Sequence, residues 1–279
     1  MHTTLCGHAV GDPESYMRQA ASADIDLVCV TCHIPMEDPG FGQMGIRMAE
    51  AELPLYWDWI GRARETGETL GVRVLGGIEA EVFPETKPLE AMDRLIADEP
   101  FDFVLGSLHH QLPVYRQWLN RHKIRDDLRI IDTYFRHLID GVYSGRYDSM
   151  SHPDVIRLYG TVNHYEATDH LGVIHDFLDA LVETDTCMEV NTSGLTKGTC
   201  VVHPDPGILA LAAEKGVRLT LGSDAHHPSS VGQFFPRVVA DLHAFGFREI
   251  HYFAKRVRHS LPLPNLRDTG SPFAGTTRG

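Results

Sequence analysis

The sequence has few features of a secreted or membrane protein. It holds only five cysteines, an odd number spread from Cys6 to Cys200, and it lacks a run of about 18 apolar residues that would span a bilayer. The first residues, MHTTLCGHAVGD, lack the basic start and the apolar core of a signal peptide. Sparse, unpaired cysteine is typical of reducing compartments. We therefore expect a cytoplasmic protein with no disulfide framework and no membrane partner.

Positive charge is also scarce. The chain has 25 Lys and Arg against 38 Asp and Glu, which gives a formal net charge of −13 over 279 residues. Because binding to a nucleic-acid backbone needs a basic surface, a nucleic-acid polymer is not an expected partner. A small anionic substrate remains compatible with this charge, since bound divalent cations can reverse the local field. The 17 histidines are the unusual part of the composition.

Short apolar segments alternate with longer amphipathic ones along the chain. The apolar segments predict strands at 26–33, 72–81, 102–110, 147–152, 188–194, 218–226 and 249–253. The amphipathic segments predict helices at 12–23, 45–67, 127–146, 170–184, 205–216 and 231–246. Asp12 and Pro13 are typical of a helix start, and Pro54 marks a break or a new start within 45–67.

This alternation predicts an α/β fold in which parallel strands are joined by helical crossovers. Seven or eight such units favour a closed or distorted β/α barrel over an open, doubly wound sheet. We expect a single barrel domain over residues 1–265. The polar, glycine-rich text that follows is interpreted as a C-terminal tail over residues 266–279.

Side chains that ligate metals follow five of the predicted strands. They are His33, Glu79, His109, His152 and the pair Asp224 and His226. In β/α barrels the chemistry lies at the carboxyl ends of the strands, so we expect these groups to converge there. Separated Asp, Glu and His ligands suit Zn²⁺, Mn²⁺ or Fe²⁺. Glu79 is the predicted bridge, because a carboxylate has two oxygens and can join two or three ions.

Seven motifs occur in an order that resembles the PHP superfamily, and most closely its histidinol-phosphatase branch. They are HTTLCGHA (2–9), TCH (31–33), GIE (77–79), GSLHH (106–110), SHPD (151–154), NTSG (191–194) and SDAH (223–226). The resemblance extends from residue 2 to about residue 255. It implies a distorted (β/α)7 barrel, a trinuclear metal site and a phosphomonoesterase that acts through a metal-bridging hydroxide. The implied substrate is a small phosphorylated metabolite, with L-histidinol phosphate as the leading candidate.

The resemblance also implies a set of ligands, residue by residue. The first ion would be held by His2, Glu79 and Asp224, the second by Glu79, His109 and His152, and the third by His8, His33 and His226. Of these residues, Glu79, Asp224 and His226 are the predicted catalytic groups.

The sequence departs from the family pattern at two positions. The family has a further histidine two positions before His2, which would precede Met1. We expect an upstream start, and the alternatives are an incomplete first site or a gap filled by the α-amine of Met1 or by water. Cys32 stands where the family has aspartate. Cys29 and Cys32 are predicted to face opposite ways in a strand, which argues against a redox pair.

Further residues are candidates for binding the substrate. Asn191 and Ser193 end a predicted strand on the same barrel face and could hold phosphate oxygens. The basic candidates for phosphate are Lys197, Arg157 and Arg47. We expect second-layer or surface roles for His110 and His227. A solvated surface location is expected for the remaining histidines, such as His122, His137, His170, His175, His243 and His259.

Two other functions stay open at this point. Related barrels hydrolyse nucleotides or phosphodiesters with the same metals, and the acidic composition is compatible with a mononucleotide. A non-catalytic, metal-binding regulatory module is the alternative from a different class, and the departures at the N-terminus and at Cys32 favour it.

Overall fold

A curled parallel sheet forms the centre of the molecule. The computed structural model describes residues 1–36, 38–42 and 45–264. In this part of the chain six strands pair in chain order: β1 (Leu27–Val30), β2 (Arg73–Glu81), β3 (Phe103–Ser107), β4 (Ser149–Met150), β5 (Cys187–Asn191) and β6 (Leu219–Gly222). All five pairings are parallel. The predicted α/β class is confirmed, and the barrel takes the form of a half-barrel of six strands. The predicted tail, 266–279, lies outside the described residues.

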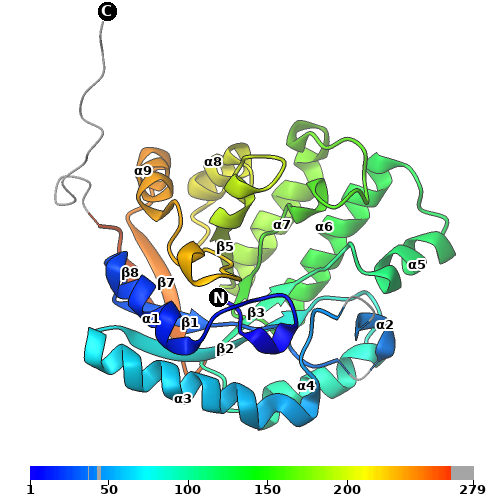
Figure 1. Ribbon diagram of the computed structural model, residues 1–279. Helices are drawn as coiled ribbons and strands as arrows, with labels where there is room; N and C mark the ends of the chain where they lie inside the picture. Colours follow the sequence, from blue (N-terminus) through cyan, green and yellow to red (C-terminus); the bar gives the residue numbers. More distant parts are fainter. Residues whose placement is uncertain (37, 43–44, 265–279) are drawn as a thin grey trace, which may run out of the picture.

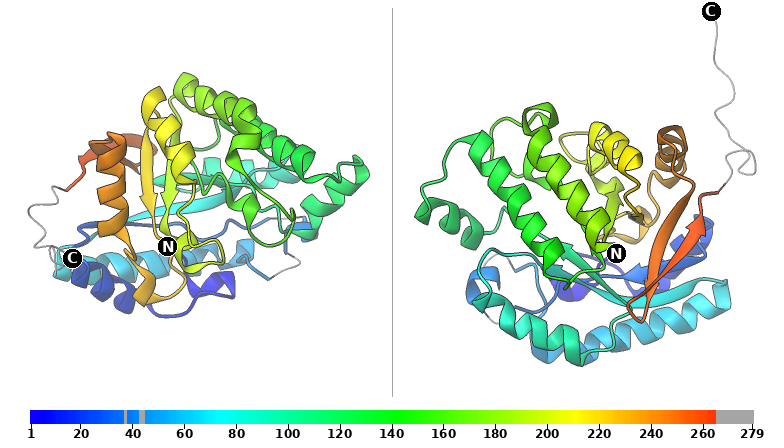
Figure 2. Two further views of the ribbon diagram at one scale, coloured as in Figure 1. Left: turned by 90° about the horizontal axis from the view of Figure 1, so that it is seen from above. Right: turned by 180° about the vertical axis from the view of Figure 1, so that it is seen from behind.

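Helices surround the outside of this sheet (Figures 1 and 2). Those described are α1 (Pro13–Ser22), α2 (Pro39–Gly42), α3 (Leu53–Leu70), α4 (Glu90–Asp98), α5 (Pro113–Arg121), α6 (Asp127–Tyr143), α7 (Leu171–Thr184), α8 (Pro206–Lys215) and α9 (Phe235–Phe245). Helix α3 packs on β2 and on α1, while α6, α7, α8 and α9 pack one against the next. This arrangement leaves the carboxyl ends of the strands free for a site.

The helix starts follow from their first residues. Asp12 caps α1, its side chain accepting a hydrogen bond from the Ser15 N–H at 2.7 Å, and Pro13 occupies the first turn as predicted. The prediction of helix over 45–67 was wrong at its start, because α3 begins only at Leu53. Pro54 lacks an N–H and is tolerated in the first turn of a helix but not in its interior. Gly71, with φ of 75°, ends the helix.

The last predicted strand differs from the expectation. Segment 249–253 does form strand β7 (Glu249–Ala254), but it pairs antiparallel with β8 (Val257–Pro262), which the sequence did not predict. The alternating burial of β7 fits a two-stranded ribbon with one face on the protein and one toward solvent. Helices α4 and α5 were also missed, since each is a single short segment of nine residues.

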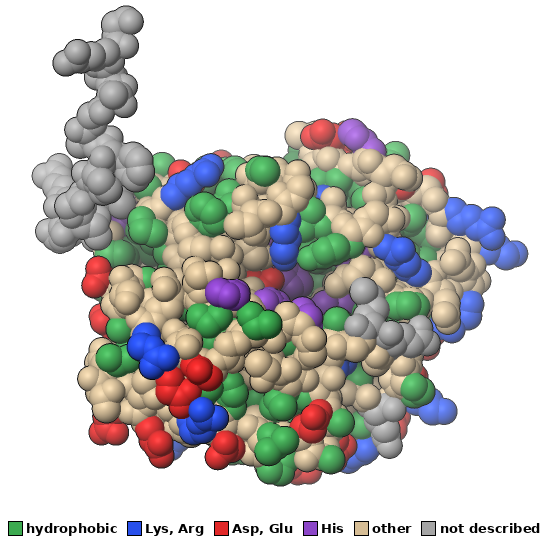
Figure 3. Space-filling view, in the orientation of Figure 1, with side chains coloured by type: hydrophobic (Ala, Val, Ile, Leu, Met, Phe, Trp, Pro, Cys, Tyr) green, Lys and Arg blue, Asp and Glu red, His purple; other side chains and the backbone are tan. Residues whose placement is uncertain are grey.

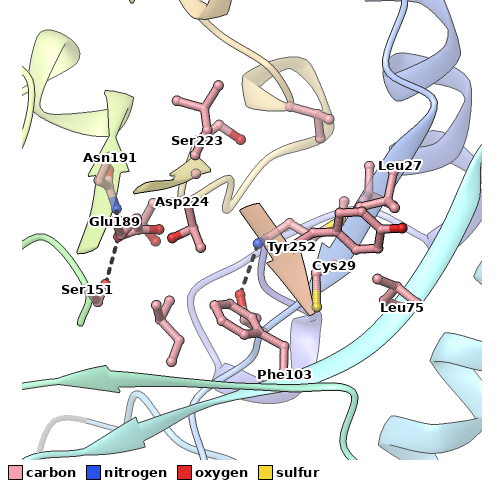
Figure 4. Close-up of a pocket in the computed structure, with 18 of the residues that line it drawn as sticks. Leu27, Cys29, Leu75, Phe103, Ser151, Glu189, Asn191, Ser223, Asp224 and Tyr252 are labelled. Carbon is pink, nitrogen blue, oxygen red and sulfur yellow. Dashed lines mark hydrogen bonds between the residues drawn. The ribbon is translucent and has the colours of Figure 1, made fainter. Parts of the chain in front are cut away.

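The two edges of the sheet, β1 and β6, are joined at their carboxyl ends by the start of the chain. The Met1 carbonyl accepts a hydrogen bond from the Thr31 N–H at 2.9 Å, and the His2 N–H donates one to the Ala225 carbonyl at 2.9 Å. Below this junction lies an interior cavity of about 130 Å³. Figure 4 shows Leu27 and Phe103 among the residues that line it.

Strand β7 covers the opposite end of the half-barrel. Its Phe253 ring stacks on Phe103 of β3 with 5.3 Å between ring centroids. The buried Asp102 side chain accepts hydrogen bonds from the backbone N–H groups of Gly76 and Lys255, both at 2.9 Å. One carboxylate therefore ties β2, the start of β3 and the β7–β8 turn together.

Replacing Asp102 by alanine should destabilise the fold. Both backbone N–H groups would lose their acceptor, and an unpaired buried donor costs about 1–3 kcal/mol, so we expect a loss of about 2 kcal/mol or more. Urea unfolding followed by circular dichroism measures this loss. The matched control is Asp98→Ala at an exposed position. Equal unfolding midpoints for the two variants would contradict the role of Asp102.

Candidate metal centre

The structure brings all of the predicted metal ligands together at one end of the half-barrel. Seven of them line a pocket of about 260 Å³, and the eighth, His2, lines the interior cavity beside it. Figure 3 shows histidine side chains around a hollow in this face, with acidic side chains inside it. The converging residues are His2, His8, His33, Glu79, His109, His152, Asp224 and His226.

Glu79, near the end of β2, lies at the centre of the cluster. Its Oε2 is 2.8 Å from His33 Nδ1 and 3.6 Å from His2 Nε2. Its Oε1 is 3.4 Å from His152 Nε2 and 3.6 Å from His109 Nε2. The two carboxylate oxygens thus face separate pairs of imidazoles, which is the arrangement required of a bridging ligand.

Asp224, which follows β6, provides the second carboxylate of the cluster. Its Oδ1 is 3.1 Å from His2 Nε2 and 3.6 Å from His226 Nδ1. The His2 and His226 rings stack with 3.9 Å between centroids. Figure 4 shows Asp224 beside the interior cavity, and both Glu79 and Asp224 line that cavity as well as the outer pocket.

Two of these residues have unusual backbone conformations. His152 has φ of 24° and Asp224 has φ of 49°, both on the left-handed side that residues with a side chain rarely adopt. Such strain persists only where the surrounding structure enforces it, and it gathers at functional sites. The fold thus holds both side chains toward the pocket at a conformational cost.

Burial and neighbouring charge shift the pKa values of the cluster. Burial lowers the pKa of His33 to about 3 and that of His226 to about 4, so both imidazoles are neutral near pH 7. Burial alone would raise the pKa of Glu79, but the facing imidazoles, His33 foremost, outweigh it and hold this pKa well below its usual range. For His2, burial would lower the pKa, but the contact with Asp224 outweighs it and raises the pKa to about 9. The pKa values of His8 and His152 are raised as well, by Cys6 and by Glu79. Because metal binds neutral imidazole and ionised carboxylate, these three histidines would release protons on metal binding.

Several buried polar atoms of the cluster have no hydrogen-bond partner. His33 Nδ1 lies 2.8 Å from Glu79 Oε2, but the contact lacks hydrogen-bond geometry. Buried polar groups are normally satisfied, so these unpaired nitrogen and oxygen atoms in a cluster of imidazoles and carboxylates fit a site for divalent cations. The unpaired atoms are His2 Nδ1, His33 Nδ1, Glu79 Oε2, His152 Nδ1 and His226 Nε2.

Two further buried carboxylates, which were not predicted from the sequence, support the segments that carry His109 and His152. Glu81 accepts hydrogen bonds from the His109 backbone N–H at 3.1 Å and from its Nδ1 at 2.8 Å, which leaves Nε2 toward Glu79. Glu189 accepts hydrogen bonds from the Ser151 hydroxyl and the His152 N–H at 2.8 and 3.1 Å. Such partners are common behind metal-ligating histidines. The alternation of a strand, which places Glu81 on the same face as Glu79, was the signal that could have found it.

Comparison with known proteins assigns the family. The family model for the PHP domain matches residues 1–193. The chain belongs to the PHP domain family. A probable histidinol-phosphatase of Deinococcus radiodurans is 28% identical over 263 residues, which cover 92% of this chain and 96% of that protein. A probable histidinol-phosphatase of Thermotoga maritima is 22% identical over 268 residues, which cover 92% and 95%.

Solved structures share the fold of this PHP domain. The histidinol phosphate phosphatase of Lactococcus lactis, solved with zinc, L-histidinol and phosphate, superimposes with a TM-score of 0.75 at 18% identity. The match covers 93% of this chain and 97% of that one. A putative histidinol phosphatase of Listeria monocytogenes superimposes with a TM-score of 0.69 at 16% identity, covering 85% and 97%.

The predicted substrate-binding residues of the PHP domain divide into two groups. Lys197 lies at the pocket, its ammonium 2.9 Å from the Ser193 hydroxyl and 3.5 Å from Asp224 Oδ2. Ser193 in turn donates to Asp224 Oδ2 at 3.2 Å. The Asn191 amide is committed to the protein, because it donates to Glu189 and accepts from the Ser193 N–H.

The two predicted phosphate-binding arginines have other partners. Arg47 pairs with Glu81 and donates to the Ile34 carbonyl at 3.2 Å. Arg157 pairs with Asp154 and donates to the Val202 carbonyl. Neither arginine lines the outer pocket, whose lining among the described residues includes Lys197 as its one lysine or arginine. Their positive charge suggested that these arginines bind the phosphate of the substrate. In the structure, their buried guanidinium groups instead neutralise acidic side chains of the protein.

The expected surface location was wrong for four of the remaining histidines, which are buried: His137, His170, His203 and His251. His137 is buried, and its Nδ1 lies 3.1 Å from the Tyr115 hydroxyl. His170 is buried, and its Nδ1 lies 2.7 Å from Asp132 Oδ1. Both lie on or beside helix faces that pack on neighbouring helices, so their polar atoms are satisfied locally. His110 is fully buried behind the pocket, where its Nε2 lies 3.0 Å from the Val155 carbonyl.

Within the described residues, no helix is long and apolar enough to span a membrane.

Replacing Glu81 by glutamine should weaken metal binding. The amide would hold His109 in place less well than the carboxylate does, and loss of such a partner typically costs 10–100-fold in metal affinity. We expect a fall of about tenfold or more in zinc affinity, measured by competition with a chromophoric chelator. Glu85→Gln is the control, because Glu85 is exposed and pairs with Arg121. Equal zinc affinities in the two variants would show that Glu81 does not support the site.

Proposed function

We propose that this protein is a metal-dependent phosphomonoesterase whose substrate is L-histidinol phosphate. The names of its relatives in the PHP family support this activity. The observation that carries the proposal is Glu79, a buried carboxylate whose two oxygens face four imidazoles at 2.8–3.6 Å. Such a group has a clear use as a bridge between divalent cations, and two or three cations suit the hydrolysis of a phosphate ester.

The proposed reaction assigns a task to each part of the site. When bound, the divalent cations would polarise the phosphate and lower the pKa of a water to near neutrality. They would be held by the converging set of imidazoles and carboxylates, with Glu79 between them. Glu81 holds the His109 ring through its Nδ1, and Glu189 holds the backbone at His152. The cavity behind Glu79 and Asp224 is lined by a further carboxylate, Glu189, which would repel a phosphate, so the ester would approach from the outer pocket.

Lys197 is the proposed cation for the phosphate. Burial alone would lower its pKa, but the charge of Asp224 outweighs this and raises the pKa, so the ammonium stays protonated. Its Nζ also lies 5.9 Å from the centre of the Tyr159 ring, a cation–π contact that places the ammonium over the pocket.

The outer wall of the pocket offers groups for the organic part of the substrate. Gln111 lines the pocket, and its buried Oε1 has no hydrogen-bond partner in the described structure. An unpaired buried acceptor suits a donor on the ligand, such as an ammonium or an imidazole N–H. Ile46, Val155 and Tyr159 supply apolar and aromatic surface around it. This combination agrees with a substrate that carries an amine and an imidazole.

A phosphatase assay tests the proposal. Purified protein reconstituted with zinc, manganese or iron is supplied with L-histidinol phosphate, other phosphomonoesters, mononucleotides and a phosphodiester, and released phosphate is measured. We expect the highest kcat/KM on L-histidinol phosphate.

Replacing Glu79 by glutamine should abolish turnover while the circular dichroism spectrum remains unchanged, because the substitution removes the bridging charge and keeps the shape of the side chain.

Other results of this assay would contradict the proposal. Preference for a mononucleotide or a phosphodiester would establish the second candidate activity. A metal-loaded protein that hydrolyses none of these esters would be a binding module. Turnover by Glu79→Gln at the wild-type rate would exclude a bridging role.

Replacing Lys197 by methionine should weaken substrate binding. Hydrogen bonds to charged groups contribute about 1.5–3 kcal/mol, so we expect KM for the phosphate ester to rise by about tenfold or more. Lys197→Arg is the control, since it keeps the charge and should change KM less. Steady-state kinetics of the three proteins give the comparison. An unchanged KM in Lys197→Met would place the phosphate elsewhere.

A further inference from the structure

Two sulfur atoms lie at the edge of the histidine cluster, and neither belongs to the ligand sets that the family resemblance implies. Cys6 ends the short 3-10 turn Thr4–Cys6, and Cys32 follows β1. Both side chains are fully buried. Thr3 lies between them, since its carbonyl accepts from Cys6 Sγ at 3.1 Å and its hydroxyl donates to Cys32 Sγ at 3.3 Å.

Cys6 and two histidines present three ligand atoms to one point. Cys6 Sγ, a ring nitrogen of His8 and a ring nitrogen of His226 all lie within 4.8 Å of one another. The His8 Nδ1 lies 2.9 Å from the Cys6 carbonyl, and the His226 Nδ1 lies 2.9 Å from the Asp224 carbonyl. Because a carbonyl only accepts, each Nδ1 carries its hydrogen and each Nε2 keeps a free lone pair. The buried His226 Nε2 has no hydrogen-bond partner.

The local backbone supports this convergence. Gly7 separates Cys6 from His8 and has φ of 76°, in the left-handed region that favours glycine. A side chain at this position would also meet the Gly45 carbonyl oxygen, which lies 2.7 Å from the place of its Cβ. The turn that directs the Cys6 sulfur and the His8 ring to the same place therefore depends on glycine.

The structure groups His8 differently from the set that the family resemblance implies. That set joins His8 with His33 and His226. Among the described residues, however, the ligand group that contains His8 is completed by Cys6, while His33 groups with His2 and His226 and with Glu79 and His109. His8 therefore has a sulfur as its neighbouring ligand where an imidazole was expected.

We propose that the Cys6 thiolate, together with His8 and His226, is a ligand of one ion in the metal centre, and that this ion is zinc. The inference rests on the metal centre of the proposed function. A soft thiolate ligand favours zinc over manganese or magnesium, which prefer oxygen ligands. Metal binding displaces the thiol proton, and the hydrogen bond from Cys6 Sγ to the Thr3 carbonyl is lost.

Cobalt substitution tests the thiolate directly. Co²⁺ bound by a thiolate gives a sulfur-to-cobalt charge-transfer band in the near ultraviolet, which nitrogen and oxygen ligands do not give. We expect the band in the cobalt-loaded wild-type protein and its loss in Cys6→Ser. The matched control is Cys187→Ser, a buried cysteine outside the cluster, which should keep the band.

Cys32→Ser separates the two sulfurs of the cluster. Cys32 groups with His2 and Cys6, so it is the other candidate thiolate. Retention of the band in Cys32→Ser supports the assignment to Cys6. Its loss in Cys32→Ser together with its retention in Cys6→Ser would overturn the assignment, as would a wild-type protein without the band.

The wild-type protein provides a measurement that does not depend on the folding of a variant. Zinc X-ray absorption should give a sulfur neighbour at about 2.3 Å beside nitrogen and oxygen neighbours at about 2.0–2.1 Å. A zinc shell of nitrogen and oxygen alone would refute the proposal. Both spectra are independent of turnover. A protein with the sulfur signal but no phosphatase activity would refute the proposed function alone, and an active protein without the signal would refute only the thiolate ligand.

Discussion

The structure depends on how it keeps the Glu79 carboxylate charged inside the protein. Transfer of an ionised carboxylate out of water is costly unless partners compensate for it. Here the compensation comes from the Ser107 hydroxyl, which donates a hydrogen bond to Oε1, and from four imidazoles. The imidazoles lie on four different segments, after β1, β3 and β4 and at the chain start. Every one of these segments must be placed correctly for the charge to be tolerated. The stability of the half-barrel and the geometry of the site therefore depend on the same contacts.

Behind the imidazoles, further buried carboxylates hold the histidine segments in place. Glu81 is buried between His109 and the Arg47 guanidinium, and Glu189 receives hydrogen bonds from the segment that contains His152. The net charge of −13 is thus partly internal, because several carboxylates serve the histidines. An acidic chain can still handle a phosphate ester, since bound cations would dominate the field in the pocket.

Much of the site could be predicted from the sequence because of one geometric regularity. In parallel sheets with helical crossovers the strand ends share an edge, so His33, Glu79, His109 and Asp224 had to lie near one another once the alternation was recognised. The direction in which a long side chain points was harder to predict. Arg157 was expected at the phosphate, yet it lies against Asp154, because a charged residue in the sequence does not reveal which way its long side chain points. The burial of His137 and His170 depended on helix contacts between distant segments, which local periodicity does not contain.

The left-handed backbone at His152 and Asp224 has a consequence for how the site would bind a cation. These conformations are maintained by the surrounding scaffold, so the side chains occupy a small part of the space that a free chain would explore. Little conformational entropy then remains to be lost when a cation arrives. The site is preorganised, so metal binding would resemble the filling of a rigid receptor more than the coupled folding of a small zinc-dependent domain.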